Sequence, residues 1–142
     1  MRGILVAVDG SEGSKRALRF AVELSRQTGA LVHTLTILEP PTKLPFAFLD
    51  GGITLPSPSK QHADEVEAMV QSLHHDLPRE RLNVMVKVGR PAELVVEQAE
   101  VHDVDLIVMG ARGLASPAVR LLVGSVTEKV LRQSQRPVTV VP

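Results

Sequence analysis

Three short segments rich in glycine and hydroxyl groups hold the residues best suited to bind a phosphorylated ligand. They are Asp9-Gly10-Ser11, Met109-Gly110-Ala111-Arg112-Gly113 and Gly124-Ser125. Glycine lets backbone amides approach an anion closely, and amides at a helix start bind phosphate with help from the helix dipole. Asp9 would repel phosphate, but its carboxylate can accept hydrogen bonds from ribose hydroxyls or an exocyclic amine. The segments suggest a nucleotide with its base and sugar near Asp9 and its phosphates near Gly113 and Gly124.

Each of these residues also has a simpler structural explanation. Asp9 either contacts the ligand or caps the turn that follows it. Gly110 and Gly113 either approach phosphate or only permit a turn. Ser125 either binds the ligand or forms a capping box with the glutamate three residues on, and the two roles are compatible. Arg112 either pairs with phosphate or faces solvent. For Asp9 and the two glycines, a position at the end of a strand favours ligand contact.

Sequence patterns of the common nucleotide-using and hydrolytic enzymes are missing. The chain contains neither G-x-x-x-x-G-K-[ST] nor G-x-G-x-x-G, and no Ser-His-Asp set sits on a recognisable nucleophile elbow. No general base is evident near the expected phosphates, so no catalytic residue is assigned and efficient hydrolysis of a bound nucleotide is not expected. Slow turnover or self-phosphorylation stays open. A metal site is not expected either, because the histidines lack i, i+4 pairing; they are His33, His62, His74, His75 and His102.

Composition narrows the class of protein. The 142 residues include 16 basic and 16 acidic side chains, no cysteine and only 2% aromatic residues. A neutral chain without a basic stripe or aromatic platforms gives little support to nucleic-acid binding. The five apolar residues before Asp9 are too few for a signal peptide, and no stretch approaches a membrane span. A soluble cytoplasmic protein is expected.

The periodicity of apolar residues predicts strands alternating with helices. Strands are expected over residues 4–8, 31–38, 82–88, 105–109 and 138–141. Helices are expected from Ser11 to Gly29, over 62–75, from Pro91 and from about Ser125. This alternation predicts a parallel sheet with helices on both faces, in a single domain over residues 1–142. The Pro/Gly-rich segment 39–59 is expected to be a long loop within it.

The order of the motifs resembles that of the universal stress protein family over nearly the whole chain. The opening strand and turn Ile4-Leu5-Val6-Ala7-Val8-Asp9-Gly10-Ser11 resembles theirs, as does the turn Gly89-Arg90-Pro91-Ala92-Glu93. The remaining matches are Asp105-Leu106-Ile107-Val108-Met109-Gly110-Ala111-Arg112-Gly113-Leu114, Gly124-Ser125-Val126-Thr127-Glu128-Lys129-Val130 and Arg136-Pro137-Val138-Thr139-Val140-Val141.

The resemblance implies a five-stranded Rossmann-like sheet of order 3-2-1-4-5 that binds ATP, with Mg²⁺ as counter-ion. It places Asp9 against ribose or base, Ile37 and Met109 around the adenine, and Ala7 among the cofactor-binding residues. Ile37 and Met109 would be mainly core residues with one edge in the pocket. The residues implied around phosphates and ribose are Gly110, Gly113, Gly124, Ser125 and Val126, with Arg112 as a further candidate.

One departure from the family pattern leaves two functions open. The ATP-binding branch has nine residues between its Gly-x-x-Gly and Gly-Ser segments, whereas ten residues separate Gly113 from Gly124 here. The intact glycines favour a nucleotide-responsive regulatory module in the stress response. The longer spacer favours a dimeric interaction module that binds no nucleotide, and a very slow ATPase is a third reading. In either case the strand at 138–141 is expected at the sheet edge, where it can pair with its copy in a homodimer.

Overall fold

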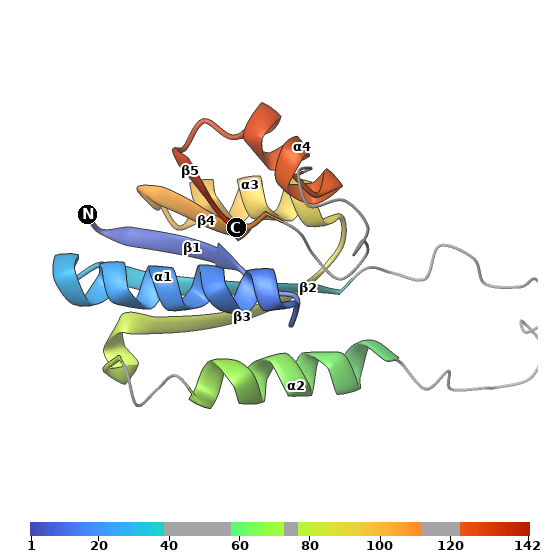
Figure 1. Cartoon of the computed structure of the whole chain (residues 1–142), viewed down its shortest axis with the longest axis horizontal. Coiled ribbons are helices and arrows are strands. Elements are labelled where there is room, and N and C mark those ends of the chain that lie inside the picture. Colours follow the sequence, from blue (N-terminus) through green and yellow to red (C-terminus); the bar gives the residue numbers. More distant parts are fainter. Residues whose placement is uncertain (39–57, 73–76, 112–122) are drawn as a thin grey trace, which may run out of the picture.

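The computed structural model describes residues 1–38, 58–72, 77–111 and 123–142, with the side chains of 58–63 left out. The elements in this part of the chain are β1 (Gly3–Ala7), α1 (Glu12–Thr28), β2 (Leu31–Leu38), α2 (Pro58–Ser72), a 3₁₀ turn (Arg79–Arg81), β3 (Leu82–Val88), α3 (Pro91–Val101), β4 (Leu106–Gly110), α4 (Ser125–Gln133) and β5 (Val138–Val141). The strands form one parallel sheet of order β3-β2-β1-β4-β5 (Figure 1). The α/β fold and strand order expected from the sequence are therefore confirmed.

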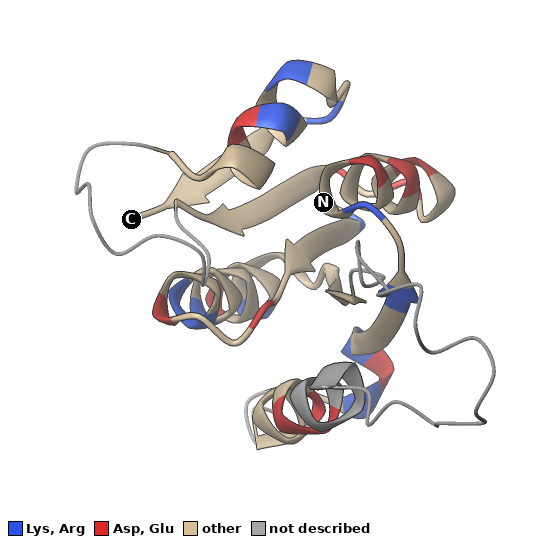
Figure 2. Cartoon of the chain, turned by 90° about the vertical axis from the view of Figure 1, so that its right-hand side faces the viewer, with Lys and Arg blue, Asp and Glu red and all other residues tan. Residues whose placement is uncertain are grey.

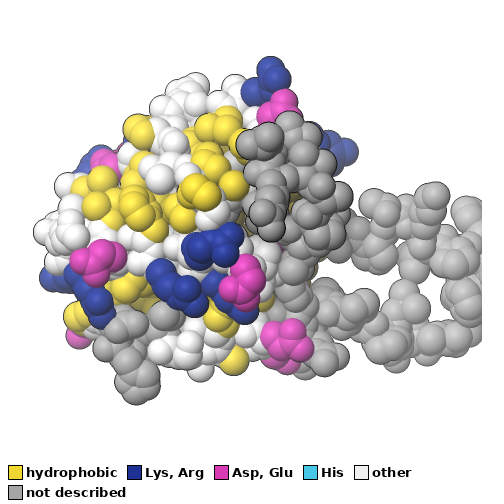
Figure 3. All heavy atoms as spheres, in the orientation of Figure 1, with side chains coloured by type: hydrophobic (Ala, Val, Ile, Leu, Met, Phe, Trp, Pro, Cys, Tyr) yellow, Lys and Arg dark blue, Asp and Glu magenta, His cyan; other side chains and the backbone are white. Residues whose placement is uncertain are grey.

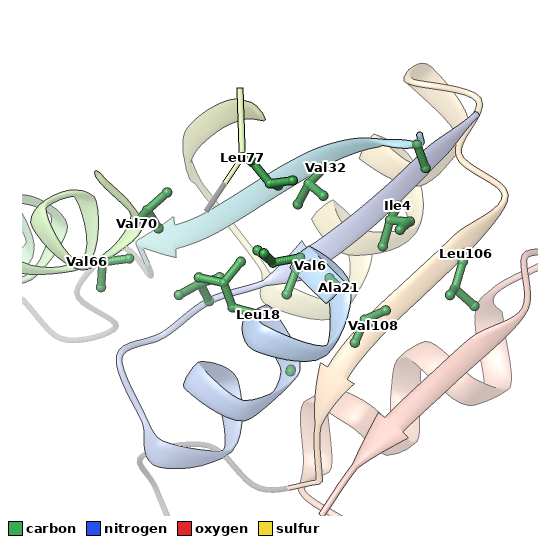
Figure 4. Packing of buried hydrophobic residues seen from close by; sticks show 14 residues of the cluster. Ile4, Val6, Leu18, Ala21, Val32, Val66, Val70, Leu77, Leu106 and Val108 are labelled. Carbon is green, nitrogen blue, oxygen red and sulfur yellow. The ribbon is translucent and has the colours of Figure 1, made fainter. Parts of the chain in front are cut away.

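Two apolar clusters, one on each face of the sheet, hold the layers together. On the face covered by α1 and α2, Ile4, Val6 and Val108 of the sheet pack against Leu18 and Val70 (Figure 4). On the other face, the fully buried Leu5, Ile107 and Leu35 pack against α3 and α4 through residues that include Val95 and Val130. Because successive strand residues point to opposite faces, β1 and β4 are apolar along their whole length.

Most helices begin at or beside the residues that the sequence predicted. Ser11 caps α1, accepting a hydrogen bond from the Ser14 amide at 3.2 Å, and Gly29 ends this helix in the left-handed conformation with φ 78°. The helix expected over 62–75 instead begins at Pro58, so the last two residues of the expected loop are helical. Proline breaks a helix interior, but its fixed φ and missing amide suit the first turn. Residues 39–57 lie outside the described part.

Three strands, β2, β3 and β5, have the expected bounds, and the other two are shifted by one residue. β1 covers 3–7 rather than 4–8, and β4 covers 106–110 rather than 105–109. Asp105 comes just before β4, and its carboxylate accepts hydrogen bonds from the amides of Arg2 and Gly3, which hold its pKa below the usual 3.8. None of the described helices is long and apolar enough to span a bilayer.

A backbone contact at the end of β4 depends on glycine. A Cβ added to Gly110 would lie 2.6 Å from the carbonyl carbon of Gly13 and 2.9 Å from the Ser14 amide nitrogen. Both neighbours are backbone atoms in the first turn of α1, so a side chain could be accommodated only by moving the helix. Glycine therefore sets the distance between β4 and α1.

A pair of histidines packs where β2 meets the end of α3. The rings of His33 and His102 lie 4.6 Å apart between centroids, and Nδ1 of His33 lies 3.1 Å from Nδ2 of Asn83. Burial, and to a smaller degree the neighbouring His102, lowers the pKa of His33 below its ordinary 6.5. Sequence spacing predicted no such contact, because the two residues are brought together only by packing.

Gly110→Ala is expected to reduce the free energy of unfolding by about 1–3 kcal/mol, the usual cost of overpacking. Urea denaturation of the variant and the wild type measures this loss. Gly3→Ala is the matched control, because its added Cβ would meet a side-chain atom of Val104 at 3.3 Å rather than backbone. An equal or larger loss for Gly3→Ala would contradict a special constraint at Gly110.

Acidification is expected to destabilise the fold through His33. The unfolded histidine takes up a proton near pH 6.5, whereas the buried one has a lowered pKa, so stability present above pH 6.5 is lost as the pH falls towards the folded pKa. Urea denaturation at pH 7.5 and 5.5 should show a smaller drop for His33→Gln than for wild type. His102→Gln should keep most of the drop, because burial is the larger cause. Identical drops for wild type and His33→Gln would refute this assignment.

Candidate functional site

The candidate site lies at the edge of the sheet where the strands end. All neighbouring strands are parallel, so their carboxyl ends meet at one edge, which Figure 2 views directly. Ala7 is the last residue of β1, Ile37 is the penultimate residue of β2, and Met109 and Gly110 end β4. This edge is where ligands bind in open parallel sheets.

Four of the residues expected around the nucleotide belong to one apolar cluster. Met109 is part of the cluster on the face covered by α3 and α4, and Ala7, Ile37 and Val126 pack against this cluster. Met109 is only 4% exposed, whereas the other three are half-buried. Met109 is therefore chiefly a core residue. Ala7, Ile37 and Val126 have partly open sides on which an apolar base could rest.

Asp9 caps the turn between β1 and α1. Its Oδ1 accepts a hydrogen bond from the Ser11 amide at 2.9 Å, and its own amide lies 3.4 Å from Oγ of Ser14. Gly10 between them has φ 85°, a conformation that favours glycine. The capping role considered from the sequence is therefore present. It is compatible with a ligand contact, because a carboxylate can accept several hydrogen bonds.

Helix α4 begins at the same edge, but without the expected capping box. Its N-cap is Gly124, in an extended conformation (φ −61°, ψ 155°), and no side chain caps it among the described residues. Ser125 is thus the first helical residue, so Glu128 is one position too late for a capping box and instead contacts Arg132 at 2.9 Å. The first intrahelical bond is made by the Glu128 amide. By helix geometry, the amides of residues 125–127 have no acceptor within the helix.

The end of β4 and the start of α4 are joined by two hydrogen bonds. The Gly124 amide donates to the carbonyl of Ala111 at 2.6 Å, so it is already engaged within the protein. The Thr127 hydroxyl donates to the carbonyl of Gly110 at 3.0 Å. Ala111 and Thr127 were not among the site residues predicted from the sequence, although a hydroxyl in the first turn of a helix after a glycine segment was a usable signal.

Several expected features fall outside the described residues. Arg112 and Gly113 lie in the segment 112–122, as does nearly all of the spacer that is one residue longer than the family pattern. In the parts of the chain that are described, no group of three or more His, Cys, Asp or Glu residues could hold a metal ion.

Comparison with known proteins agrees with this architecture. The model of the universal stress protein family matches residues 1–142. A universal stress protein of Thermus aquaticus is 34% identical over 139 residues, covering 97% of this chain and 96% of that protein. The structure of a universal stress protein, UspA, from Lactobacillus plantarum has a TM-score of 0.84 at 28% identity, covering 99% of this chain and 97% of that one. A universal stress protein solved in complex with cAMP has a TM-score of 0.67 at 27% identity, covering 99% and 97%.

The match of the family model over the whole chain is accompanied by an agreement in fold. The sheet order is the expected one, and the glycine at the end of β4 and the start of α4 at Ser125 lie where the sequence motifs place them. The chain therefore belongs to the universal stress protein family.

Proposed function

We propose that this protein binds ATP, with Mg²⁺ as its counter-ion, and acts as a nucleotide-responsive regulatory module in the stress response. The observation that carries the proposal is the convergence, at one sheet edge, of an apolar cluster, a carboxylate and an uncapped helix start. The similarity to a universal stress protein solved with cAMP supports an adenine nucleotide as the ligand class.

Each part of the edge suits one part of the nucleotide. The adenine would rest on the partly open sides of Ala7, Ile37 and Val126, beside Met109. Asp9, at the end of β1, would accept hydrogen bonds from the ribose. With few aromatic side chains in the sequence, the base would be held by aliphatic contacts rather than by stacking.

The phosphates would meet backbone amides at the start of α4. The amides and dipole of a helix start favour an anion, and the Ser125 hydroxyl lies in the same turn. Because the Gly124 amide is bound to Ala111, we assign Gly124 a steric role: it leaves room for the phosphates to approach. Arg112 and Gly113 would complete this end of the site.

We also propose a homodimer formed through β5. This strand is an edge of the sheet, next to β4 alone, and its outer backbone edge can pair with a copy of itself. Figure 3 shows hydrophobic side chains gathered over the area of β4 and β5, beside the cationic side chains of α1. An edge strand flanked by apolar surface suits a closed two-fold interface.

ATP is expected to bind with a micromolar dissociation constant, about −8 kcal/mol. Gly124→Val should weaken binding at least about tenfold, because its side chain would occupy the path of the phosphates. Valine can adopt the extended backbone conformation of this residue, so the fold should persist. Calorimetry with Mg-ATP measures both constants.

Gln133→Val, at the exposed far end of α4, is the control for this experiment and should bind ATP as the wild type does. If the wild type gives no heat and no thermal shift at millimolar Mg-ATP, nucleotide binding is wrong and the dimeric interaction module is favoured. If Gly124→Val binds normally, the phosphates lie elsewhere.

Val140→Lys is expected to convert the dimer into a monomer, because it places a charge in the edge strand that pairs. Light scattering at micromolar concentration measures the mass, and thermal unfolding checks the fold. Val88→Lys is the matched control: it lies on β3, the opposite edge of the sheet, and is 68% exposed. A monomeric wild type would refute the dimer, and a dimeric Val140→Lys protein would place the interface elsewhere.

A further inference from the structure

The Thr127 hydroxyl makes a cross-element hydrogen bond in the first turn of α4. Thr127 is the third residue of this helix and only 4% exposed. Threonine in a helix often returns its hydroxyl to a carbonyl of its own preceding turn. Here the Oγ1 atom instead donates to the carbonyl oxygen of Gly110, 17 residues earlier in the chain, at 3.0 Å. The bond therefore ties the helix to the last residue of β4.

Contacts with two neighbouring elements hold Gly110, the residue that accepts this hydrogen bond, in place. Its Cα side packs so closely on α1 that an added Cβ would lie 2.6 Å from the backbone of Gly13. One residue on, the Ala111 amide donates to the carbonyl of Val141 at 2.8 Å, which ties the end of β4 to β5. The acceptor of the Thr127 hydroxyl is thus held by α1 on one side and by β5 on the other.

The start of α4 is attached to the end of β4 at two points. The Gly124 amide bonds to the carbonyl of Ala111 at 2.6 Å, and the Thr127 hydroxyl bonds to the carbonyl of Gly110. The amides of Ser125 and Val126 lie between the two attachments. Together with the packing of Val126 and Val130, two points of attachment constrain the direction in which this turn faces more tightly than one would.

We propose that Thr127 is a positioning residue for nucleotide phosphate: it holds α4 so that the amides of Ser125 and Val126 face the phosphate group. This inference rests on the proposed nucleotide binding. The hydroxyl touches the protein rather than the ligand, so its effect reaches the nucleotide through the orientation of the turn. An amide hydrogen bond prefers an angle above about 150° and weakens steeply below about 120°, so rotation of the turn would weaken phosphate binding.

The effect is selective for the phosphate part of the ligand. Most of the adenosine contacts, those with Ala7, Ile37 and Asp9, lie outside α4 and do not depend on the direction of its amides. AMP and ATP would add contacts to those amides. Losing the Thr127 bond should therefore weaken AMP and ATP binding while leaving adenosine binding close to that of the wild type.

Thr127→Val tests the inference, because it removes the hydroxyl and keeps the shape of the side chain. Calorimetric titration of the full chain with adenosine, AMP and Mg-ATP is expected to show about a tenfold loss for the two phosphorylated ligands and less than about a twofold change for adenosine. Thr127→Ser, which keeps the hydroxyl, should restore AMP and ATP binding. Should Thr127→Val fail to fold, Thr127→Ala serves in the same comparison.

Thr28→Val is the matched control for losing a threonine hydroxyl. Its Oγ1 donates to the carbonyl of Leu24 at 2.8 Å in the last turn of α1. This turn lies just before β2 begins, far from the carboxyl ends of the strands. This variant should bind all three ligands as the wild type does.

Three results would overturn the inference. They are equal losses for adenosine and ATP in Thr127→Val, equal losses in Thr127→Ser and Thr127→Val, or a loss of ATP binding in Thr28→Val as large as in Thr127→Val. A wild-type protein that binds none of the ligands would refute the proposed function itself, and the inference with it. The wild-type titration therefore separates the two failures.

Discussion

The approach of β4 to the first turn of α1 is the contact on which the rest of the candidate site depends. It is possible because Gly110 has no side chain, and the backbone of Gly13 occupies the space that a Cβ would need. This contact brings the turn that holds Asp9 beside the end of β4. The carbonyl of Gly110 also accepts a hydrogen bond from the Thr127 hydroxyl, and this bond holds the start of α4 near the end of β4. A wider separation at this point would move apart the groups proposed to hold the two ends of one ligand.

The site that results relies on backbone groups and apolar surface more than on charged side chains. The formal net charge of the chain is zero, so its overall charge does not attract anions over a distance. Amides at a helix start act only at short range, so recognition would depend on fit. An adenine nucleotide suits such a site, because its flat base needs apolar contacts and its phosphates need donors.

At the other end of the sheet, where the strands begin, ion pairs and hydrogen bonds join the strands and turns. Arg2 pairs with Asp103 at 2.8 Å, Arg136 reaches the same carboxylate at 3.0 Å, and Asp105 accepts the amides at the start of β1. These contacts tie the first strand to the turns before β4 and β5. Exposed ion pairs contribute little individually, but here they fix chain ends and loops.

The sequence alone determined the layered fold, the strand order through the family motifs, and the residue types at the carboxyl edge. Apolar periodicity and turn residues are local properties, so they placed most elements within a few residues, and Ser11 and Gly29 signalled their caps correctly. The predictions from the sequence were wrong where one residue type can occupy two kinds of position in a helix or loop. Pro58 starts a helix rather than breaking one, and Gly124 takes the N-cap position expected for Ser125.

Tertiary structure decided the contacts between residues far apart in the chain. The His33–His102 pair, the Thr127–Gly110 bond and the close packing of Gly110 on Gly13 join residues on different elements. Their distances depend on how helices pack on the sheet, which is set by the combined shapes of many side chains. No spacing in the sequence encodes that packing, so only the folded chain shows which hydroxyl bonds to which carbonyl.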